Sequence, residues 1–174
     1  MFGLQGKTKG SQPGAAPVGV RWMIRQDMPN VLAIEGSSEL FPWDEEQFLA
    51  HLRNRNTIGT VAEADGHVVA YLIYELAKDF IVVNKLCVES GWRNHGIGSE
   101  MIRRLLEKLN HTKRTGVCFE VPESNLDALF FLKRNGFRAE NILRGGFPPT
   151  GEDLFTMVYR KDSHGRGNDE CRGR

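Results

Sequence analysis

The residues best suited to chemistry lie in a glycine-rich segment between a predicted strand and a predicted helix. The segment reads Val88-Glu89-Ser90-Gly91-Trp92-Arg93-Asn94-His95-Gly96-Ile97-Gly98-Ser99. Because glycine lacks a Cβ atom, the backbone N–H groups of a tight turn can approach an anion closely. The helix N-terminus adds unpaired N–H groups and a partial positive charge. The segment therefore predicts a site for a phosphate or pyrophosphate group.

Two common phosphate-binding loops do not match this segment. Gly91 and Gly96 have the spacing of a P-loop, but Ile97-Gly98 replaces the Lys and Ser/Thr that such a loop requires. Met101 stands where the last glycine of a G-x-G-x-x-G pattern would be. These differences disfavour a nucleoside triphosphatase and a dinucleotide-binding dehydrogenase.

The elements that must position this turn follow from hydrophobic periodicity. Apolar residues recur every four positions in Gly96–Leu109, as in an amphipathic helix. Asp65-Gly66 separates two β-rich runs and predicts a type I′ hairpin. In chain order we expect a strand at Val20–Arg25, helices from Asp27 to about Glu39 and from Asp44, strands at Thr57–Ala64, His67–Leu76 and Phe80–Glu89, a helix at Gly96–Leu109, a strand at Gly116–Val121, a helix at Leu126–Arg134, and strands at Phe137–Ile142 and Leu154–Arg160.

Length and charge limit the broad class of the protein. The chain has 174 residues, of which 40% are hydrophobic, as in an ordinary soluble domain. Its net charge of +1 disfavours a general nucleic-acid binder. The ends are rich in glycine and small polar residues, so we expect one domain at 20–160 between disordered tails at 1–19 and 161–174.

Cysteine usage and hydropathy point to the cytoplasm. Cys87, Cys118 and Cys171 are an odd number without metal-ligand spacing, which predicts neither a disulfide framework nor a metal site. The longest apolar runs, Val68–Ile73 and Phe80–Val83, are too short to span a bilayer, and the N-terminus has no secretory signal pattern. We therefore expect no membrane partner.

The pattern Arg93-x-x-Gly96-x-Gly98 resembles the Q/R-x-x-G-x-G/A motif of the GNAT superfamily of acyl-CoA N-acyltransferases. Asn125 and Asn135-Gly136-Phe137 extend the resemblance, which covers about 20–160. It implies an α/β fold of the GNAT type, with a mixed and mostly antiparallel central sheet, splayed central strands and about four helices. The RimI-like branch of ribosomal-protein-alanine N-acetyltransferases is the most similar, through Phe41-Pro42-Trp43, Glu120-Val121, Ser124-Asn125 and Gly146-Phe147-Pro148.

The resemblance also implies a binding site for acetyl-CoA, used as a cosubstrate without a metal. Backbone groups at the end of one strand would meet the pantetheine arm and the thioester, the turn would hold the pyrophosphate, and one asparagine would contact the pantetheine region. The residues concerned are Leu86, Cys87, Val88, Arg93, Asn94, His95, Gly96, Ile97, Gly98, Ser99 and Asn125.

The resemblance implies that Glu120, which matches the general base of the RimI-like branch, is the catalytic residue. The alternative is a structural role, in which this acid caps or pairs with a neighbouring strand. One position departs from the family. Leu132 stands where a tyrosine normally protonates the coenzyme A thiolate. The chain has three tyrosines that could replace it: Tyr71, Tyr74 and Tyr159.

The expected function is transfer of an acetyl group from acetyl-CoA to an amine by direct attack in a ternary complex. A protein N-terminal α-amine is the leading acceptor, and a small-molecule amine is the alternative. Because Leu132 lacks a hydroxyl, a catalytically weak acyl-CoA-binding sensor module stays open, as does a purely structural interaction domain. We expect a monomer or homodimer.

Overall fold

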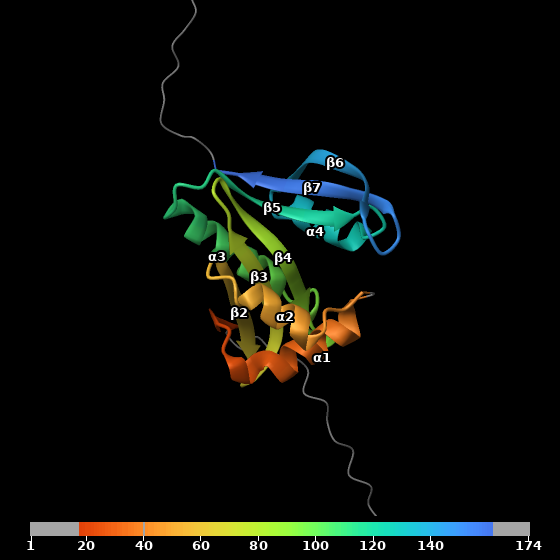
Figure 1. Ribbon diagram of the computed structural model, residues 1–174. Helices are drawn as coiled ribbons and strands as arrows, with labels where there is room; N and C mark the ends of the chain where they lie inside the picture. The colour runs from red at the N-terminus through yellow and green to blue at the C-terminus, as the bar shows by residue number, and fades with distance from the viewer. Residues whose placement is uncertain (1–17, 40, 162–174) are drawn as a thin grey trace, which may run out of the picture.

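The computed structural model describes residues 18–39 and 41–161. Apart from residues 18, 19 and 161, the predicted tails lie outside this part of the chain. The elements are β1 (Gly19–Trp22), α1 (Met28–Ser38), α2 (Glu45–Leu52), β2 (Thr57–Ala64), β3 (His67–Leu76), β4 (Phe80–Val88), α3 (Ile97–Asn110), β5 (Gly116–Pro122), α4 (Leu126–Arg134), β6 (Arg138–Phe147) and β7 (Glu152–Arg160). This order confirms the predicted succession of helices and strands (Figure 1).

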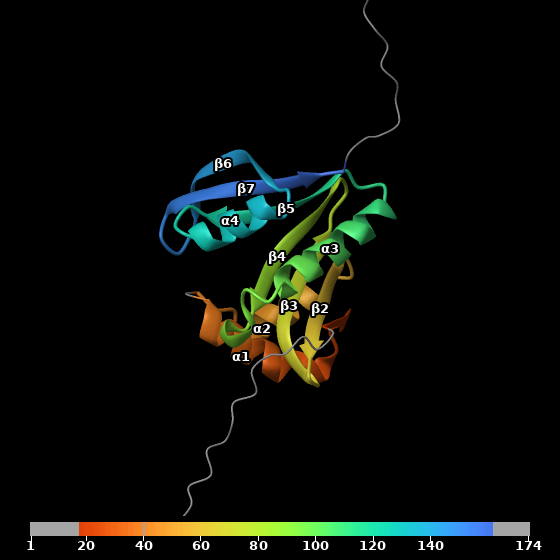
Figure 2. The ribbon, with the colours of Figure 1, turned by 180° about the vertical axis from the view of Figure 1, so that it is seen from behind.

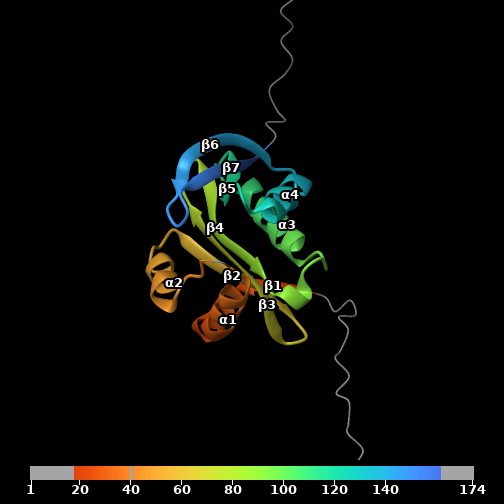
Figure 3. The ribbon, with the colours of Figure 1, turned by 90° about the vertical axis from the view of Figure 1, so that its right-hand side faces the viewer.

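One seven-stranded sheet runs through the molecule in the order β1-β2-β3-β4-β5-β7-β6. Only β4 and β5 pair in parallel, and the other neighbours are antiparallel. In side view, α1 and α2 cover one face and α3 and α4 the other (Figure 3). The core is accordingly divided into an α3/α4-side cluster that includes Met101 and Leu132 and an α1/α2-side cluster that includes Val31 and Phe48.

The parallel pairing of β4 with β5 stops early. It joins Phe80–Val83 to Gly116–Phe119, after which the strands diverge (Figures 1 and 2). The pairing of β4 with β3 also shifts register here, so that Asn84 is an extra residue on β4, as in a β-bulge. This divergence confirms the splayed central strands expected from the resemblance.

Local sequence signals account for the elements beside the divergence. Asp65 and Gly66 both have positive φ, 50° and 77°, as a type I′ hairpin requires. The Asp44 carboxylate caps α2 by accepting a hydrogen bond from the N–H of Gln47 (2.8 Å). The left-handed Gly136 (φ 87°) ends α4 as predicted.

The prediction of β1 was wrong at its C-terminal end. The strand ends at Trp22, and a single 3-10 turn follows at Arg25–Asp27, where the prediction had placed the end of the strand. Asp27 does precede α1, but its carboxylate does not cap that helix. Instead it accepts hydrogen bonds from Arg21 (2.7 and 2.8 Å) and from the N–H of Ile24 (2.8 Å).

Within the described residues, no helix combines the length and apolarity needed to cross a bilayer.

Candidate active site

The predicted phosphate-binding turn enters α3 through a left-handed backbone. Asn94 and Gly96 have φ of 63° and 79°, a region that glycine adopts without strain. The first helical hydrogen bond of α3 runs from the N–H of Glu100 to the carbonyl oxygen of Gly96 (2.9 Å). The N–H groups that precede Glu100 are therefore directed out of the helix end. A Cβ on Gly98 would lie 3.1 Å from the Phe131 ring of α4. Gly96 therefore permits the turn, whereas Gly98 permits close packing of α3 on α4.

The side chains of this turn divide into exposed and buried groups. Those exposed to solvent are Arg93, Asn94, His95 and Ser99. Ile97 is buried in the α3/α4-side core. The Arg93 Nε donates a hydrogen bond to the carbonyl oxygen of Val88 (3.0 Å), and the Nδ1 of His95 lies 2.8 Å from the carbonyl oxygen of Arg93. A guanidinium is therefore held where β4 ends.

The three predicted thioester-binding residues lie on the diverging half of β4. Leu86, Cys87 and Val88 all follow Val83, the last residue that pairs with β5. Leu86 and Val88 pack against the α3/α4-side core, and Cys87 is buried in the α1/α2-side core. Burial raises the pKa of the Cys87 thiol.

Glu120 lies across the divergence, on β5. It is exposed and pairs in the sheet with Thr156 of β7. Since Phe119 is buried in the α3/α4-side core, strand alternation directs Glu120 to the opposite face, together with Cys118. Burial, with the nearby charge of Glu120, raises the pKa of the Cys118 thiol.

The start of α4 supplies Asn125, and its interior supplies Leu132. Asn125 is exposed, and its side chain caps α4 by accepting a hydrogen bond from the N–H of Ala128 (3.1 Å). Leu132 is 1% exposed, within the α3/α4-side core. No hydroxyl is available from that position.

The three tyrosines are committed to other contacts. Tyr71 donates a hydrogen bond to Glu35, and burial together with that bond raises its pKa. The Tyr74 hydroxyl accepts a hydrogen bond from Lys108 (2.8 Å), and burial raises its pKa to about 12. The Tyr159 ring packs in the α3/α4-side core, in a part of β7 that pairs with the beginning of β5. Tyr71 and Tyr74 are therefore hydrogen-bonded elsewhere, and Tyr159 lies beside the part of β5 that still pairs with β4.

Aromatic residues join the α1–α2 loop to the β6–β7 end of the sheet. Phe41 and Phe147 make an edge-to-face contact with ring centroids 5.6 Å apart. Trp43 stacks on His51 of α2 (4.2 Å) and meets Phe48 edge to face (5.3 Å). The loop between the first two helices therefore reaches across the diverging strands to the last hairpin.

Beneath this loop is a buried ion pair that the sequence analysis missed. Glu35 is fully buried and accepts hydrogen bonds from the Tyr71 hydroxyl and the N–H of Trp43 (2.9 Å). The Nζ of Lys85 lies 2.8 Å from a Glu35 oxygen and 3.8 Å from a Glu39 oxygen. Lys85 is a charged residue within the largely apolar run Phe80–Val88, and this feature of the sequence could have indicated a buried ion pair.

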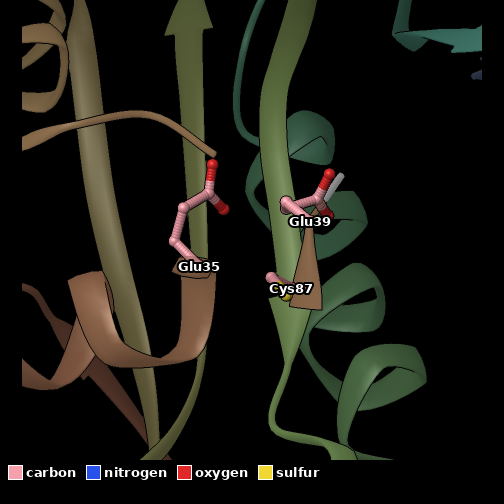
Figure 4. Close-up of side chains that lie close together, drawn as sticks. All are labelled: Glu35, Glu39 and Cys87. Atoms are coloured by element: carbon pink, nitrogen blue, oxygen red, sulfur yellow. The ribbon is translucent and has the colours of Figure 1, made fainter. Parts of the chain in front are cut away.

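Glu35, Glu39 and Cys87 bring potential metal-ligand atoms within 4.8 Å of one another (Figure 4). The geometry favours an ion-pair cluster instead. The Lys85 ammonium already contacts Glu35, and the raised pKa of Cys87 disfavours the thiolate that binds metals.

Comparisons with known proteins agree with this geometry. Residues 20–137 match the model of the Acetyltransferase (GNAT) family. A Bacillus subtilis protein provisionally named a ribosomal protein bS18-alanine N-acetyltransferase is 27% identical over 139 residues, which cover 79% of this chain and 92% of that protein. An N-alpha-acetyltransferase of Sulfurisphaera tokodaii is 27% identical over 124 residues, covering 64% and 74% of the two chains. The crystal structure of the Escherichia coli ribosomal-protein-S18-alanine N-acetyltransferase superposes with a TM-score of 0.75 at 22% identity, covering 82% of this chain and 93% of that chain.

Proposed function

Because this chain belongs to the Acetyltransferase (GNAT) family, we propose that it transfers the acetyl group of acetyl-CoA to the α-amine of a protein N-terminus. Family membership makes it an acetyl-transferring enzyme. One observation carries the proposal: the β4–β5 pairing ends at Val83, and the diverging half of β4 leads to the left-handed turn at Gly96. The divergence and the turn together suit a long ligand that has a pyrophosphate at one end.

In this proposal acetyl-CoA lies between β4 and β5. The backbone from Leu86 to Val88 pairs with β3 but not with β5, so the N–H and C=O groups directed away from β3 are available to the amides of the pantetheine arm. The pyrophosphate binds the N–H groups at the start of α3, where the helix dipole favours negative charge. Arg93 and Asn125 lie on opposite sides of this path, at the ends of β4 and β5.

Acetyl transfer to an amine requires a neutral nitrogen, a polarised thioester carbonyl and a proton for the departing thiolate. Glu120 is proposed as the general base, because it is exposed at the point where β5 has left β4. The raised pKa values of Cys87 and Cys118 keep both thiols protonated, which disfavours an acetyl-cysteine intermediate. Direct attack in a ternary complex is therefore the proposed route.

The acceptor is proposed from the curated relatives. Their names specify a ribosomal-protein alanine and N-alpha termini, so a protein N-terminus is favoured over a small-molecule amine. The free thiols of Cys87 and Cys118 are compatible with action in the cytoplasm, as a monomer or homodimer.

A catalytically weak acyl-CoA sensor is the second candidate. It is favoured by Leu132, which is buried and has no hydroxyl, and by the contacts that occupy the three tyrosines. A sensor would bind acetyl-CoA but release no thiol with any acceptor.

The test combines titration calorimetry of acetyl-CoA with a free-thiol assay on peptides that have free N-termini and on small amines. We expect micromolar binding, thiol release with peptides, and a fall in kcat of about 100-fold in Glu120→Gln. Glu46→Gln, an exposed glutamate on α2, is the control and should keep wild-type activity. Binding without release would support the sensor, and absence of binding would refute both.

A further inference from the structure

Glu39 is a second carboxylate at the divergence of the strands, beside β4, whereas Glu120 lies on β5. It immediately follows α1, and its N–H bonds back to Glu35 (3.0 Å). Figure 4 shows its side chain in front of the strand that carries Cys87, and its carboxylate lies within 4.8 Å of the Cys87 sulfur. Cys87 belongs to the diverging half of β4, where the proposed thioester lies.

Glu39 competes with Glu35 for its nearest cation, and the charge of Arg93 acts on it from farther away. Two carboxylates, Glu35 and Glu39, share the single ammonium of Lys85. Lys85 is closer to Glu35 by 1.0 Å, and Glu35 also has the Tyr71 hydroxyl and the Trp43 N–H as donors. Glu35 is thereby satisfied, whereas the Glu39 carboxylate has a 3.8 Å contact with Lys85 and the field of Arg93, and it can accept a closer cation.

Glu39 is accessible to such a cation, whereas Glu35 is not. The Glu39 side chain is 33% exposed and that of Glu35 is 0% exposed. Burial, assisted by the charge of Glu35 and opposed by Lys85 and Arg93, raises the pKa of Glu39. A carboxylate with a raised pKa accepts a proton more readily near neutral pH than an ordinary one does.

We propose that Glu39 binds the ammonium group of the acceptor and removes its first proton. This inference rests on the proposed acetyl transfer. The ammonium loses one proton to Glu39, and the neutral nitrogen forms a bond to the thioester carbonyl carbon. The nitrogen then loses a second proton to Glu120, the carbon–sulfur bond breaks, and the thiolate takes a proton from solvent. Glu39 and Glu120 each return one proton to solvent, so that the products are the acetylated amine, coenzyme A and, in net, one proton.

Glu39 and Glu120 differ in how their roles depend on the protonation state of the acceptor amine. An α-amine with a pKa of about 7.7–8.0 is mostly protonated at about pH 6.5 and mostly neutral at about pH 9. Glu39 is needed for the protonated form, whereas Glu120 acts after attack at either pH. Loss of Glu39 should therefore be costly at low pH and mild at high pH.

The experiment measures kcat/KM for a peptide with an N-terminal alanine across this pH range, in the full-length wild type, Glu39→Gln, Glu39→Asp and Glu120→Gln. We expect Glu39→Gln to lose about 100-fold at about pH 6.5 and less than about 10-fold at about pH 9. Glu39→Asp should retain the wild-type pH dependence, and Glu120→Gln should lose activity at both pH values. The affinity for acetyl-CoA should not change in Glu39→Gln.

Three results would overturn the proposal. An equal loss of kcat/KM at both pH values would mean that Glu39 has only a structural role. Thermal unfolding shows whether Glu39→Gln is folded. If it is not, the pH dependence of Glu39→Asp is compared with that of the wild type instead. An unchanged kcat/KM would remove Glu39 from the reaction. A wild type that releases no thiol would refute the proposed function itself, and this proposal with it. Glu46→Gln again serves as the exposed control.

Discussion

A single side chain, Leu132, separates this site from the catalytic arrangement that the family motif implies. The residue is buried against the α3/α4-side core, where it contributes packing but no proton. Tyr71 and Tyr74 are hydrogen-bonded to Glu35 and Lys108, and Tyr159 lies beside the part of β5 that still pairs with β4. In the proposed reaction the departing thiolate would therefore take its proton from solvent, which should slow turnover without abolishing it.

Restoring the phenol at position 132 should raise kcat. Leu132→Tyr places a proton donor on α4, and Leu132→Phe adds a similar ring volume without the hydroxyl. Both variants should be less stable than the wild type by about 1–3 kcal/mol, because the position is closely packed. Thiol-release kinetics should show a higher kcat for Leu132→Tyr than for Leu132→Phe. Equal rates would mean that proton donation from α4 does not limit turnover.

At the scale of elements, the corner between β1 and α1 depends on a charged pair. The Asp27 side chain is 6% exposed and that of Arg21 is 39% exposed, and Arg21 also contacts Glu63 of β2 (2.9 Å). The same carboxylate accepts the N–H of Ile24. Asp27 therefore fixes the entry of α1, the helix that carries Glu35 and ends beside Glu39.

Asp27→Asn should destabilise the protein in a pH-dependent manner. Hydrogen bonds from Arg21, assisted by Ile24 and opposed by burial, hold the pKa of Asp27 below its usual value. The stabilisation is therefore present above the unfolded-state pKa of about 3.9 and is lost as pH falls through the lower folded-state pKa. Because Arg21 is partly exposed, we expect a loss of about 1–2 kcal/mol at neutral pH.

Urea unfolding at neutral pH and near pH 3 measures this difference, with the exposed Asp79→Asn as control. The difference in the free energy of unfolding between wild type and Asp27→Asn should be smaller at the lower pH. A difference that stays constant would show that the Asp27 side chain stabilises the protein by its packing and not by its charge.

The elements that local signals govern could be predicted from the sequence, and the contacts between distant elements could not. Asp65-Gly66 has the residues that a type I′ turn needs, and Gly96 and Gly136 adopt the left-handed backbone that glycine favours. The end of β1 was missed because the partners of Asp27 are Arg21 and the Ile24 backbone.

The same limit applies to the candidate site. The turn and Glu120 were found because a motif and a matching position carry them. Glu39 and Lys85 were missed, because they are 46 residues apart in sequence and meet only when α1 packs on β4.

At the scale of the whole molecule, the sheet consists of two halves joined at β4 and β5. Only Phe80–Val83 and Gly116–Phe119 pair across the junction. On the α3/α4 face Gly98 lies against Phe131, and on the α1/α2 side Phe41 meets Phe147. A ligand between the strands would therefore contact both halves and hold them together.

Acetyl-CoA should stabilise the chain and protect the junction. At a free concentration of about 100 times Kd, binding to the folded state adds about 2.7 kcal/mol to the free energy of unfolding. Hydrogen exchange should slow more at Leu86–Val88 and Gly96–Ser99 than in the β1–β2 pair at the sheet edge, which is the internal comparison. Protection confined to the β1–β2 pair would place the ligand elsewhere.

The early end of the β4–β5 pairing also gives the sheet two inner edges in addition to its outer ones at β1 and β6. Exposed strand edges are templates for pairing with other chains, which leads to self-association. The pantetheine arm would cover these inner edges whenever acetyl-CoA is bound. Bound acetyl-CoA would then reduce aggregation of the enzyme in addition to being its cosubstrate. In a cell low in acetyl-CoA, more of the enzyme would have exposed inner edges and would be prone to self-association.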